Sequence, residues 1–160
     1  MNPYASHLAD RDPFTVIAAT AQELDRRTAS LTPESANRSP APGKWSVRQI
    51  VCHLADTEIA FAFRIRQALA EPNHVIQPFD QDRWADRYDA YDLPSALELF
   101  SAMRRWNLRL LTTLAPRDFD KPLSHPERGA MTFRTLVETM AGHDLNHLSQ
   151  IESAQLNGLN

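Results

Sequence analysis

Two histidines near the end of the chain, His143 and His147, have a spacing that suits a shared metal ion. Residues four apart on an α-helix project from one face, one turn above the other. Both fall in an apolar stripe, at positions where Leu or Ile is expected. The stripe consists of Phe133, Leu136, Val137, Met140 and Ile151. Burying two imidazoles there costs about 1–3 kcal/mol for each nitrogen that lacks a partner. The pair by itself indicates either a metal site or two ordinary hydrogen-bonded histidines.

A third histidine, His53, lies at the edge of the apolar face of an earlier helical stretch. One histidine on such a face is usually a hydrogen-bonded core residue. Three on the inward faces of a bundle favour a metal, because cofactor sites in bundles are built from facing helices. Three neutral imidazoles without a carboxylate or thiolate are typical of a catalytic zinc-type site, which keeps a position open for water or substrate.

The other three histidines give weaker signals. His7 is expected in an N-terminal tail, and His74 in a loop. His125 precedes Pro126 in a turn that could face the metal, although a turn away from the site is the favoured interpretation.

Several residues beside the histidines are open to two interpretations. Asp56 and Thr57 share the helix face of His53 and are candidates to orient its imidazole, although a solvated Asp56 is equally compatible. Cys52 points about 100° away from His53 around the helix, and we predict that it is a packing residue. Gly142 either allows a close approach beside the metal or has no special role.

Four further residues are candidates for a chemical or a packing role. Glu138 and Asp144 are candidate bases, but their spacing selects neither of them. Trp45 and Trp106 are expected to be core and helix-cap residues.

These residues must be positioned by helices. Four stretches contain no proline and show apolar residues at three- and four-residue steps, and they are 14–32, 43–71, 95–115 and 127–160. Ser46 and Gln49 have the spacing of a capping box at the start of the second helix. No stretch alternates with the period of a strand. The sequence therefore predicts an all-α four-helix bundle with long connecting loops and no sheet.

The three connections, 32–45, 71–92 and 116–131, are long for a bundle. The middle one permits a crossover with parallel second and third helices, and a short helix within it is expected to cover one end of the bundle. It also collects aromatic and basic side chains. We predict that Arg83, Arg87 and Trp84 bind an anionic or thiol-bearing small molecule over the metal. A packed cap with solvated charges is the alternative.

Composition narrows the class of protein. The chain has 160 residues and a net charge of −3, which suits one domain spanning 1–160 and disfavours a general nucleic-acid binder. A single cysteine, Cys52, excludes an intramolecular disulfide and fits a reducing compartment. The first 13 residues lack an apolar signal core, and no window approaches 18 apolar residues. We therefore expect a cytoplasmic protein that does not bind membranes.

Two motifs together resemble the DinB/YfiT-like family of metalloenzymes, and the YfiT branch in particular. The first is KWSVRQIVCHLAD at Lys44–Asp56, and the second is HDLNHLSQI at His143–Ile151. The likeness extends through Ile76–Asp80 with Trp84, and through His125-Pro126. It implies an up-down-down-up four-helix bundle that forms homodimers. It also implies a divalent metal, zinc or nickel, held by His53, His143 and His147.

The chain departs from the YfiT-like pattern at two positions beside the triad. Asn146 and Cys52 stand where relatives have histidines. These changes spare the three ligands and bear on the substrate. Members of the superfamily include thiol-dependent transferases that use bacillithiol or mycothiol, and metal-dependent hydrolases.

The leading interpretation is a metal-dependent S-transferase or hydrolase acting on a small molecule, with a low-molecular-weight thiol as the cosubstrate of the transferase reaction. The alternatives are a non-catalytic metal- or ligand-binding bundle and a structural bundle with buried histidines.

Overall fold

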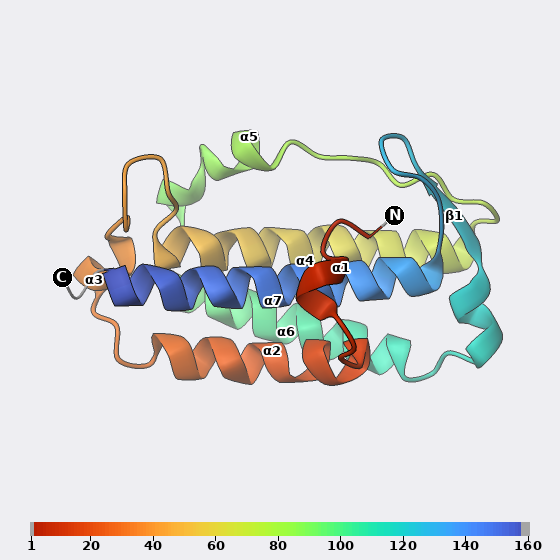
Figure 1. Ribbon diagram of the computed structural model, residues 1–160, viewed down its shortest axis with the longest axis horizontal. Helices are drawn as coiled ribbons and strands as arrows, with labels where there is room; N and C mark the ends of the chain where they lie inside the picture. Colours follow the sequence, from red (N-terminus) through yellow and green to blue (C-terminus); the bar gives the residue numbers. More distant parts are fainter. Residues whose placement is uncertain (1, 158–160) are drawn as a thin grey trace.

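Four long helices make up most of the structure, a computed structural model that describes residues 2–157 (Figure 1). They are α2 (Pro13–Thr28), α4 (Val47–Ala70), α6 (Leu93–Leu111) and α7 (Phe133–Asn157). Each coincides with one proline-free stretch, so the predicted four-helix bundle is confirmed. α2 begins at Pro13 and α6 at Leu93, slightly before the proline-free stretches themselves, because a proline in the first turn of a helix breaks no hydrogen bond. The expected end of the fourth helix, residues 158–160, lies outside the described residues.

The start of each long helix is fixed by a local side chain. Ser46 and Gln49 form the predicted capping box, with the Gln49 side chain accepting from the Ser46 N–H at 3.0 Å. Asp12 caps α2 and Asp92 caps α6, each accepting a backbone N–H three residues later. Thr132 accepts the N–H of the third residue of α7 at 3.3 Å. Short-range chemistry therefore decides where the helices begin.

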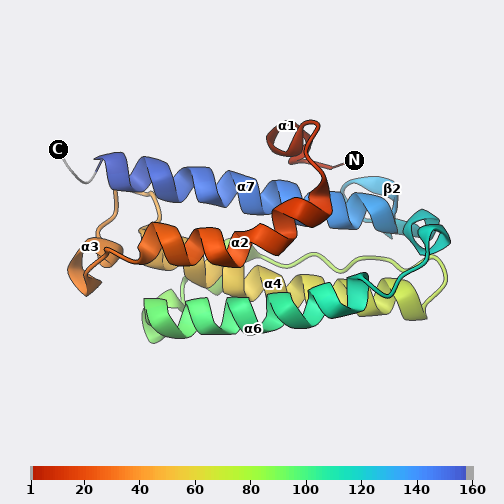
Figure 2. The same ribbon diagram turned by 90° about the horizontal axis from the view of Figure 1, so that it is seen from below.

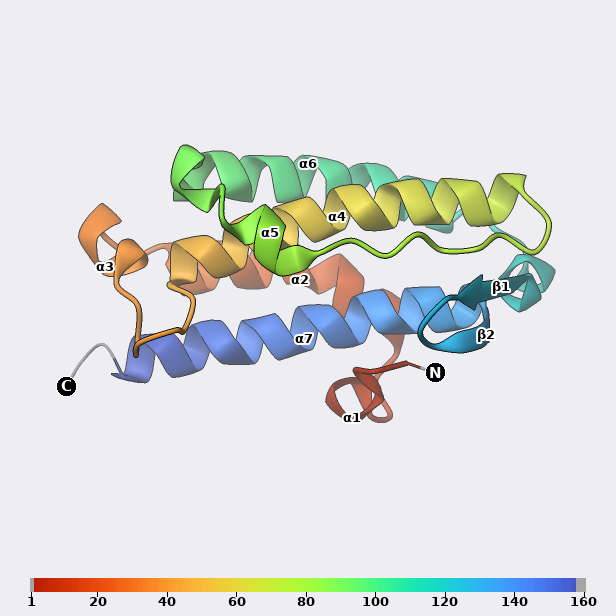
Figure 3. The ribbon, with the colours of Figure 1, turned by 90° about the horizontal axis from the view of Figure 1, so that it is seen from above.

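The helices follow the up-down-down-up order that the family resemblance implies. α2 and α4 run antiparallel, α4 and α6 run parallel, and α7 returns (Figures 1 and 2). The connection between α4 and α6 must travel back along the bundle, since α4 is about 36 Å long at 1.5 Å per residue. Figure 3 shows it running beside α4 and α7, with the short helix α5 (Gln81–Ala85) on the way. A 3-10 turn, η1 (Tyr88–Ala90), precedes α6. The predicted short helix exists, but the expectation that it covers an end of the bundle is wrong.

Two arginines of α4 fasten this connection to the bundle. Arg48 donates to the carbonyl oxygen of Tyr91 at 2.9 Å and to the Asp89 carboxylate at 3.0 Å. Arg64 donates to the carbonyl oxygen of Gln77 at 3.0 Å. The segment is thus held at both of its ends against the helix that bears His53.

A small antiparallel sheet precedes α7, so the prediction of no sheet is wrong. It pairs β1 (Pro122–His125) with β2 (Gly129–Thr132), and Leu123 lies opposite Met131. Four-residue strands are too short to show a clear two-residue alternation in the sequence. The other short elements are α1 (Ala5–Leu8), α3 (Pro33–Asn37) and a 3-10 helix, η2 (Pro116–Asp120).

Two apolar clusters are separated by a layer of buried polar side chains at the middle of the bundle. Along α4 the buried side chains are apolar at Leu54, polar at Glu58 and apolar again at Phe61. On α7 they change from Met140 to polar residues and back to Leu148. The layer contains Thr20, His53, Thr57, Glu58, Arg104, Asn107, His143, Asp144 and His147. Because polar groups in an interior require partners, this layer is where chemistry is expected.

No helix in residues 2–157 combines the length and hydropathy that a membrane span requires. Trp106 is 60% exposed, so its predicted place in the core is wrong.

Candidate metal centre

The three histidines singled out from the sequence converge in the polar layer. His53 Nε2 lies 3.0 Å from His143 Nε2, and His147 Nε2 lies 3.1 Å from the same atom. Each residue offers a ligand atom within 4.8 Å of the others, and all three side chains are buried. Ninety residues separate His53 from His143, so the packing of α4 against α7 creates the cluster.

The three Nε2 atoms carry too few protons to hydrogen-bond to one another in full. His147 Nδ1 lies 2.9 Å from Gln150 Oε1, an acceptor, so the proton of this ring is on Nδ1 and its Nε2 presents a lone pair. A single proton on His143 Nε2 can point at only one of its two neighbouring Nε2 atoms. His53 Nδ1 has no hydrogen-bond partner among residues 2–157. A cation shared by the three Nε2 atoms would give each Nε2 atom a partner, so the donor set fits a divalent metal.

Burial keeps the three imidazoles neutral. Desolvation, with a smaller contribution from the neighbouring His147, lowers the pKa of His53 to about 3. Desolvation also lowers the pKa of His147 to about 4 and depresses the pKa of His143 well below its usual range. Neutral imidazole is the form that binds a metal, so the site is ready for one at neutral pH.

Aromatic rings surround the cluster. The Trp45 ring centroid lies 4.9 Å from that of His53, and its plane is nearly parallel to the His147 ring, at 6.5 Å. Tyr4 meets His143 edge-on at 5.3 Å. Trp45 was expected only as a core or cap residue, and Tyr4 was missed because no local pattern brings the N-terminus to α7.

Gly142 explains how Tyr4 reaches the site. A Cβ atom at Gly142 would lie 2.6 Å from the Tyr4 carbonyl oxygen and 2.7 Å from Tyr4 Cβ. Gly142 thus permits a close approach beside His143, as one of the two interpretations of this residue held. The approaching segment is the N-terminal one before α1, rather than another long helix.

A cavity of about 620 Å³ adjoins the centre and reaches His147. Its wall comes from the loop before α4, from α4 itself, from α5, from α7 and from Tyr4. The lining residues are Tyr4, Pro40, Ala41, Gly43, Lys44, Trp45, Ile50, Gln81, Asp82, Asn146, His147, Ser149, Gln150, Ser153 and Ala154. A larger cavity of about 780 Å³ near α3 contains none of the three histidines. Of these two cavities, the one beside His147 is where a small molecule would lie next to the cluster.

The predicted substrate-binding residues lie near this cavity but not in its wall. Arg83 has an 84% exposed side chain and pairs with Asp80 at 3.3 Å. Trp84 packs on Phe79 with ring centroids 4.5 Å apart, and Arg87 is exposed. The first two residues of α5 line the cavity in their place. Whether these three side chains bind a substrate stays a prediction.

The candidates to orient His53 have other partners. The Thr57 hydroxyl donates to the backbone carbonyl of His53 and lies 3.2 Å from that of Leu54. Asp56 is half-buried beside the Tyr88 hydroxyl, and burial raises the pKa of its carboxyl group. Neither residue holds the imidazole.

Cys52 packs in an apolar cluster, and burial raises the pKa of its thiol to about 11. It is therefore the packing residue that the sequence predicts, with a protonated thiol at neutral pH.

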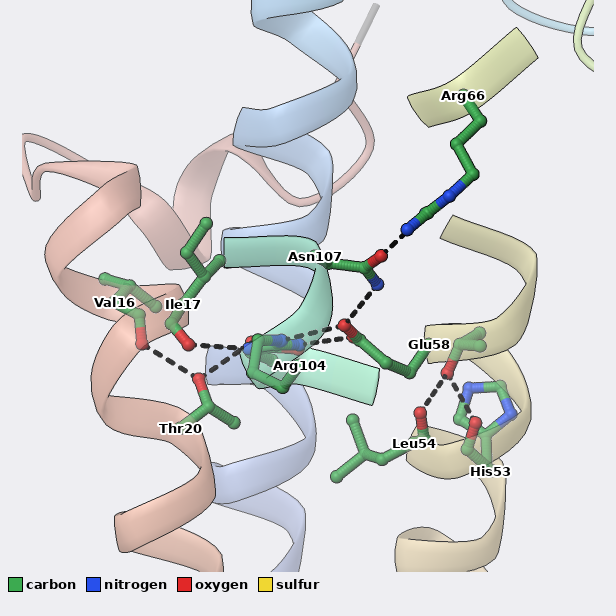
Figure 4. Close-up of polar contacts among 11 residues, drawn as sticks. Val16, Ile17, Thr20, His53, Leu54, Glu58, Arg66, Arg104 and Asn107 are labelled. Atoms are coloured by element: carbon green, nitrogen blue, oxygen red, sulfur yellow. Dashed lines mark hydrogen bonds and ion pairs between the residues drawn. The ribbon is translucent and has the colours of Figure 1, made fainter. Parts of the chain in front are cut away.

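Asp144, one of the two candidate bases, is bound by a buried arginine. Figure 4 shows Arg104 of α6 among Glu58, Ile17 and Thr20. Arg104 Nη1 lies 2.6 Å from Asp144 Oδ2, and Arg104 Nη2 lies 2.7 Å from Glu58 Oε2. Arg104 was not expected from the sequence to lie in the polar layer. A signal existed, because Phe100, Arg104, Asn107 and Leu111 form one stripe of α6.

The remaining histidines lie outside the cluster. His7 is exposed on α1. His74 is buried and pairs with Glu71 through Nδ1 at 2.6 Å. His125 is buried, and its Nδ1 accepts the N–H of Glu127.

The fold and the site define a class: a four-helix bundle of up-down-down-up order with three histidines clustered on two of its helices. The family model of the DinB superfamily matches residues 17–151, and the chain belongs to this superfamily, as the two motifs indicated.

Two relatives in bacteria carry names of the same kind. The chain is 35% identical over 132 residues to "Putative metal-dependent hydrolase OB0782" of Oceanobacillus iheyensis, covering 81% of this chain and 76% of the relative. It is 32% identical over 134 residues to "Putative metal-dependent hydrolase BcerKBAB4_2443" of Bacillus mycoides, covering 82% and 76%.

Two solved structures share the fold. YfiT from Bacillus subtilis, described as a probable metal-dependent hydrolase with an unusual four-helix bundle topology, superposes with a TM-score of 0.84 at 24% identity. The match covers 90% of this chain and 84% of YfiT. TT2238, a four-helix bundle protein, gives a TM-score of 0.64 at 18% identity, covering 88% and 96%.

Proposed function

We propose that this protein is a metal-dependent enzyme that acts on a small molecule, with hydrolysis as its first candidate reaction. His53, His143 and His147 hold a divalent ion, zinc or nickel, through their Nε2 atoms. The observation that carries the proposal is the convergence of three buried Nε2 atoms next to a cavity of about 620 Å³. The names of the two relatives in Oceanobacillus and Bacillus support it.

A bound divalent ion supplies Lewis acidity, which polarises a carbonyl group and lowers the pKa of water to about 7. The chain supplies the surroundings. Gln150 holds His147 in the tautomer that binds through Nε2. Trp45 and Tyr4 place aromatic rings against the histidines and in the cavity wall, and Lys44 and Asp82 place one charge of each sign there. Such a cavity suits a small polar substrate with an apolar part.

A thiol-dependent S-transferase is the second candidate, and two observations bear on it. The cavity has room for a low-molecular-weight thiol beside an acceptor molecule, since its volume lies within the range of about 300–1,000 Å³ for drug-sized ligands. The chain has no reactive thiol of its own, because Cys52 is buried and protonated. A thiol nucleophile would therefore come from a cosubstrate such as bacillithiol or mycothiol.

The test begins with the metal content of protein purified without a histidine tag. We expect one divalent ion per chain, or one after loading with zinc or nickel. Failure to retain either ion would refute the metalloenzyme.

Loaded protein is then assayed with p-nitrophenyl esters, and with chlorodinitrobenzene plus bacillithiol or mycothiol. Turnover in the first assay supports the hydrolase, and turnover in the second supports the transferase. A loaded protein that is inactive in both assays would favour a non-catalytic metal- or ligand-binding bundle.

A further inference from the structure

The guanidinium of Arg104 sits in the polar layer and uses all of its donors. Nε donates to Glu58 Oε1 at 3.1 Å, and Nη2 donates to Glu58 Oε2 at 2.7 Å. Nη1 donates to Asp144 Oδ2 at 2.6 Å and to the carbonyl oxygen of Ile17 at 2.8 Å. Nη2 also reaches Asp144 Oδ1 at 3.2 Å. Since a guanidinium has five N–H groups, none is left over, and one side chain of α6 joins α2, α4 and α7.

Each carboxylate oxygen that faces Arg104 accepts at least one hydrogen bond. Asn107 donates to Glu58 Oε1 at 2.9 Å, and Arg66 in turn donates to Asn107 Oδ1 at 2.8 Å. The Thr20 hydroxyl lies 2.7 Å from Asp144 Oδ2. Figure 4 follows this chain of contacts from Thr20 on α2 to Arg66 on α4. Buried ion pairs are often no more stabilising than apolar side chains of similar volume, so stability alone does not account for so many directed contacts.

The two carboxylates that Arg104 joins are neighbours of the metal-site histidines. Asp144 directly follows His143 on α7, and Glu58 comes five residues after His53 on α4. Five residues correspond to about 7.5 Å along a helix. Arg104 therefore ties together the two ligand-bearing helices, close to the level at which His53 and His143 meet.

A metal ion needs its ligands at well-defined distances, so the link that Arg104 makes between α4 and α7 affects metal binding. A slip of one residue moves a side chain about 1.5 Å along a helix and turns it by about 100°, whereas metal–ligand distances tolerate changes of only about 0.2 Å. Apolar contacts between α4 and α7 are tolerant of small shifts, but the paired contacts of one guanidinium with two carboxylates are not.

We propose that Arg104 is a positioning residue of the metal centre: through Glu58 and Asp144 it locks α4 and α7 in the register that brings His53 and His143 together. The inference rests on the proposed function, in that the three histidines hold a divalent ion.

The test is a Co²⁺ titration of metal-free protein, followed by visible absorption, which reports both affinity and coordination geometry. Two variants weaken the lock: Arg104→Lys keeps the charge but loses the planar fork, and Glu58→Gln keeps the shape and the pairing of Arg104 with Asp144. Leu111→Ala is the matched control, because it removes a buried apolar side chain from the same helix. Circular dichroism checks that each variant is helical.

We expect the dissociation constant for Co²⁺ to rise about tenfold to a hundredfold in Arg104→Lys and Glu58→Gln, the range typical of residues that orient metal ligands. The absorption spectrum of bound Co²⁺ should change with it. Leu111→Ala should unfold at a lower temperature but bind Co²⁺ within about twofold of the wild type, as expected of distant sites.

Unchanged affinity and spectrum in both network variants would overturn the inference and leave Arg104 a structural residue. Loss of the fold in Glu58→Gln would overturn it as well, since the network would then serve folding as a whole. Wild-type protein that binds no Co²⁺ refutes the proposed function itself, and this inference with it.

Discussion

The metal-free protein should lose stability as the pH falls from 7 to 5, because its central imidazoles are buried. Burial, with the neighbouring His147 adding to it, lowers the pKa of His53 to about 3, and burial lowers the pKa of His147 to about 4. In the unfolded chain, both pKa values return to about 6.5. At pH values between the folded and the unfolded pKa, the unfolded chain binds more protons than the folded one. The free energy of unfolding therefore decreases as the pH falls.

The size of the effect at pH 5 depends mainly on the unfolded chain. Proton binding stabilises an unfolded imidazole with pKa 6.5 by about 2.1 kcal/mol at pH 5 and by about 0.2 kcal/mol at pH 7. A folded imidazole with pKa 4 or below regains less than about 0.1 kcal/mol at pH 5. His53 and His147 should therefore each remove about 2 kcal/mol of stability between pH 7 and pH 5. Their sum, about 4 kcal/mol, is a large part of the 5–15 kcal/mol of a typical domain.

The assay is urea unfolding of chelator-treated protein at both pH values, followed by circular dichroism. The double variant His53→Asn, His147→Asn cannot titrate at these positions, so it should lose about 4 kcal/mol less than the wild type over the same interval. His7→Ala removes an exposed histidine and should keep the wild-type dependence. Equal losses in the wild type and the double variant would refute the reasoning.

Three further outcomes are expected. His143→Ala removes the imidazole that both other rings face, so tight metal binding should be abolished, as measured by metal analysis after dialysis. Gly142→Ala should lower the unfolding midpoint, since the added methyl group meets the Tyr4 carbonyl oxygen at 2.6 Å, and overpacking of this kind costs about 1–3 kcal/mol. The double variant Arg83→Ala, Arg87→Ala should bind an active substrate more weakly, seen as a raised KM, while metal content and thermal stability stay unchanged.

Each of these has a result that would contradict it. His74→Ala is the control for His143→Ala and should keep full metal occupancy. Full metal occupancy in His143→Ala would show that His143 is not a metal ligand. Alanine is about 1 kcal/mol more favourable than glycine inside a helix, so a more stable Gly142→Ala protein would show that Tyr4 does not pack there. Unchanged KM in the double arginine variant, or a loss of stability with it, would exclude these arginines from substrate binding.

Much of the bundle follows from local chemistry. Helix periodicity, a first-turn proline such as Pro13 and the capping box of Ser46 with Gln49 set the helices, because these signals act within a few residues. The spacing of His143 and His147 placed both on one helix face for the same reason. The small sheet could not be predicted from the sequence, because its strands have only four residues each.

The sequence by itself determined four amphipathic helices, their starts and the two motifs that mark the family. Only the tertiary structure decided that His53 meets His143, that Tyr4 closes over Gly142, and that Arg104 is buried between two carboxylates. The physical reason is the range of the interactions. Caps and helix faces depend on neighbours a few residues away, whereas the partners of these side chains are 40 to 138 residues distant and meet only when the helices pack.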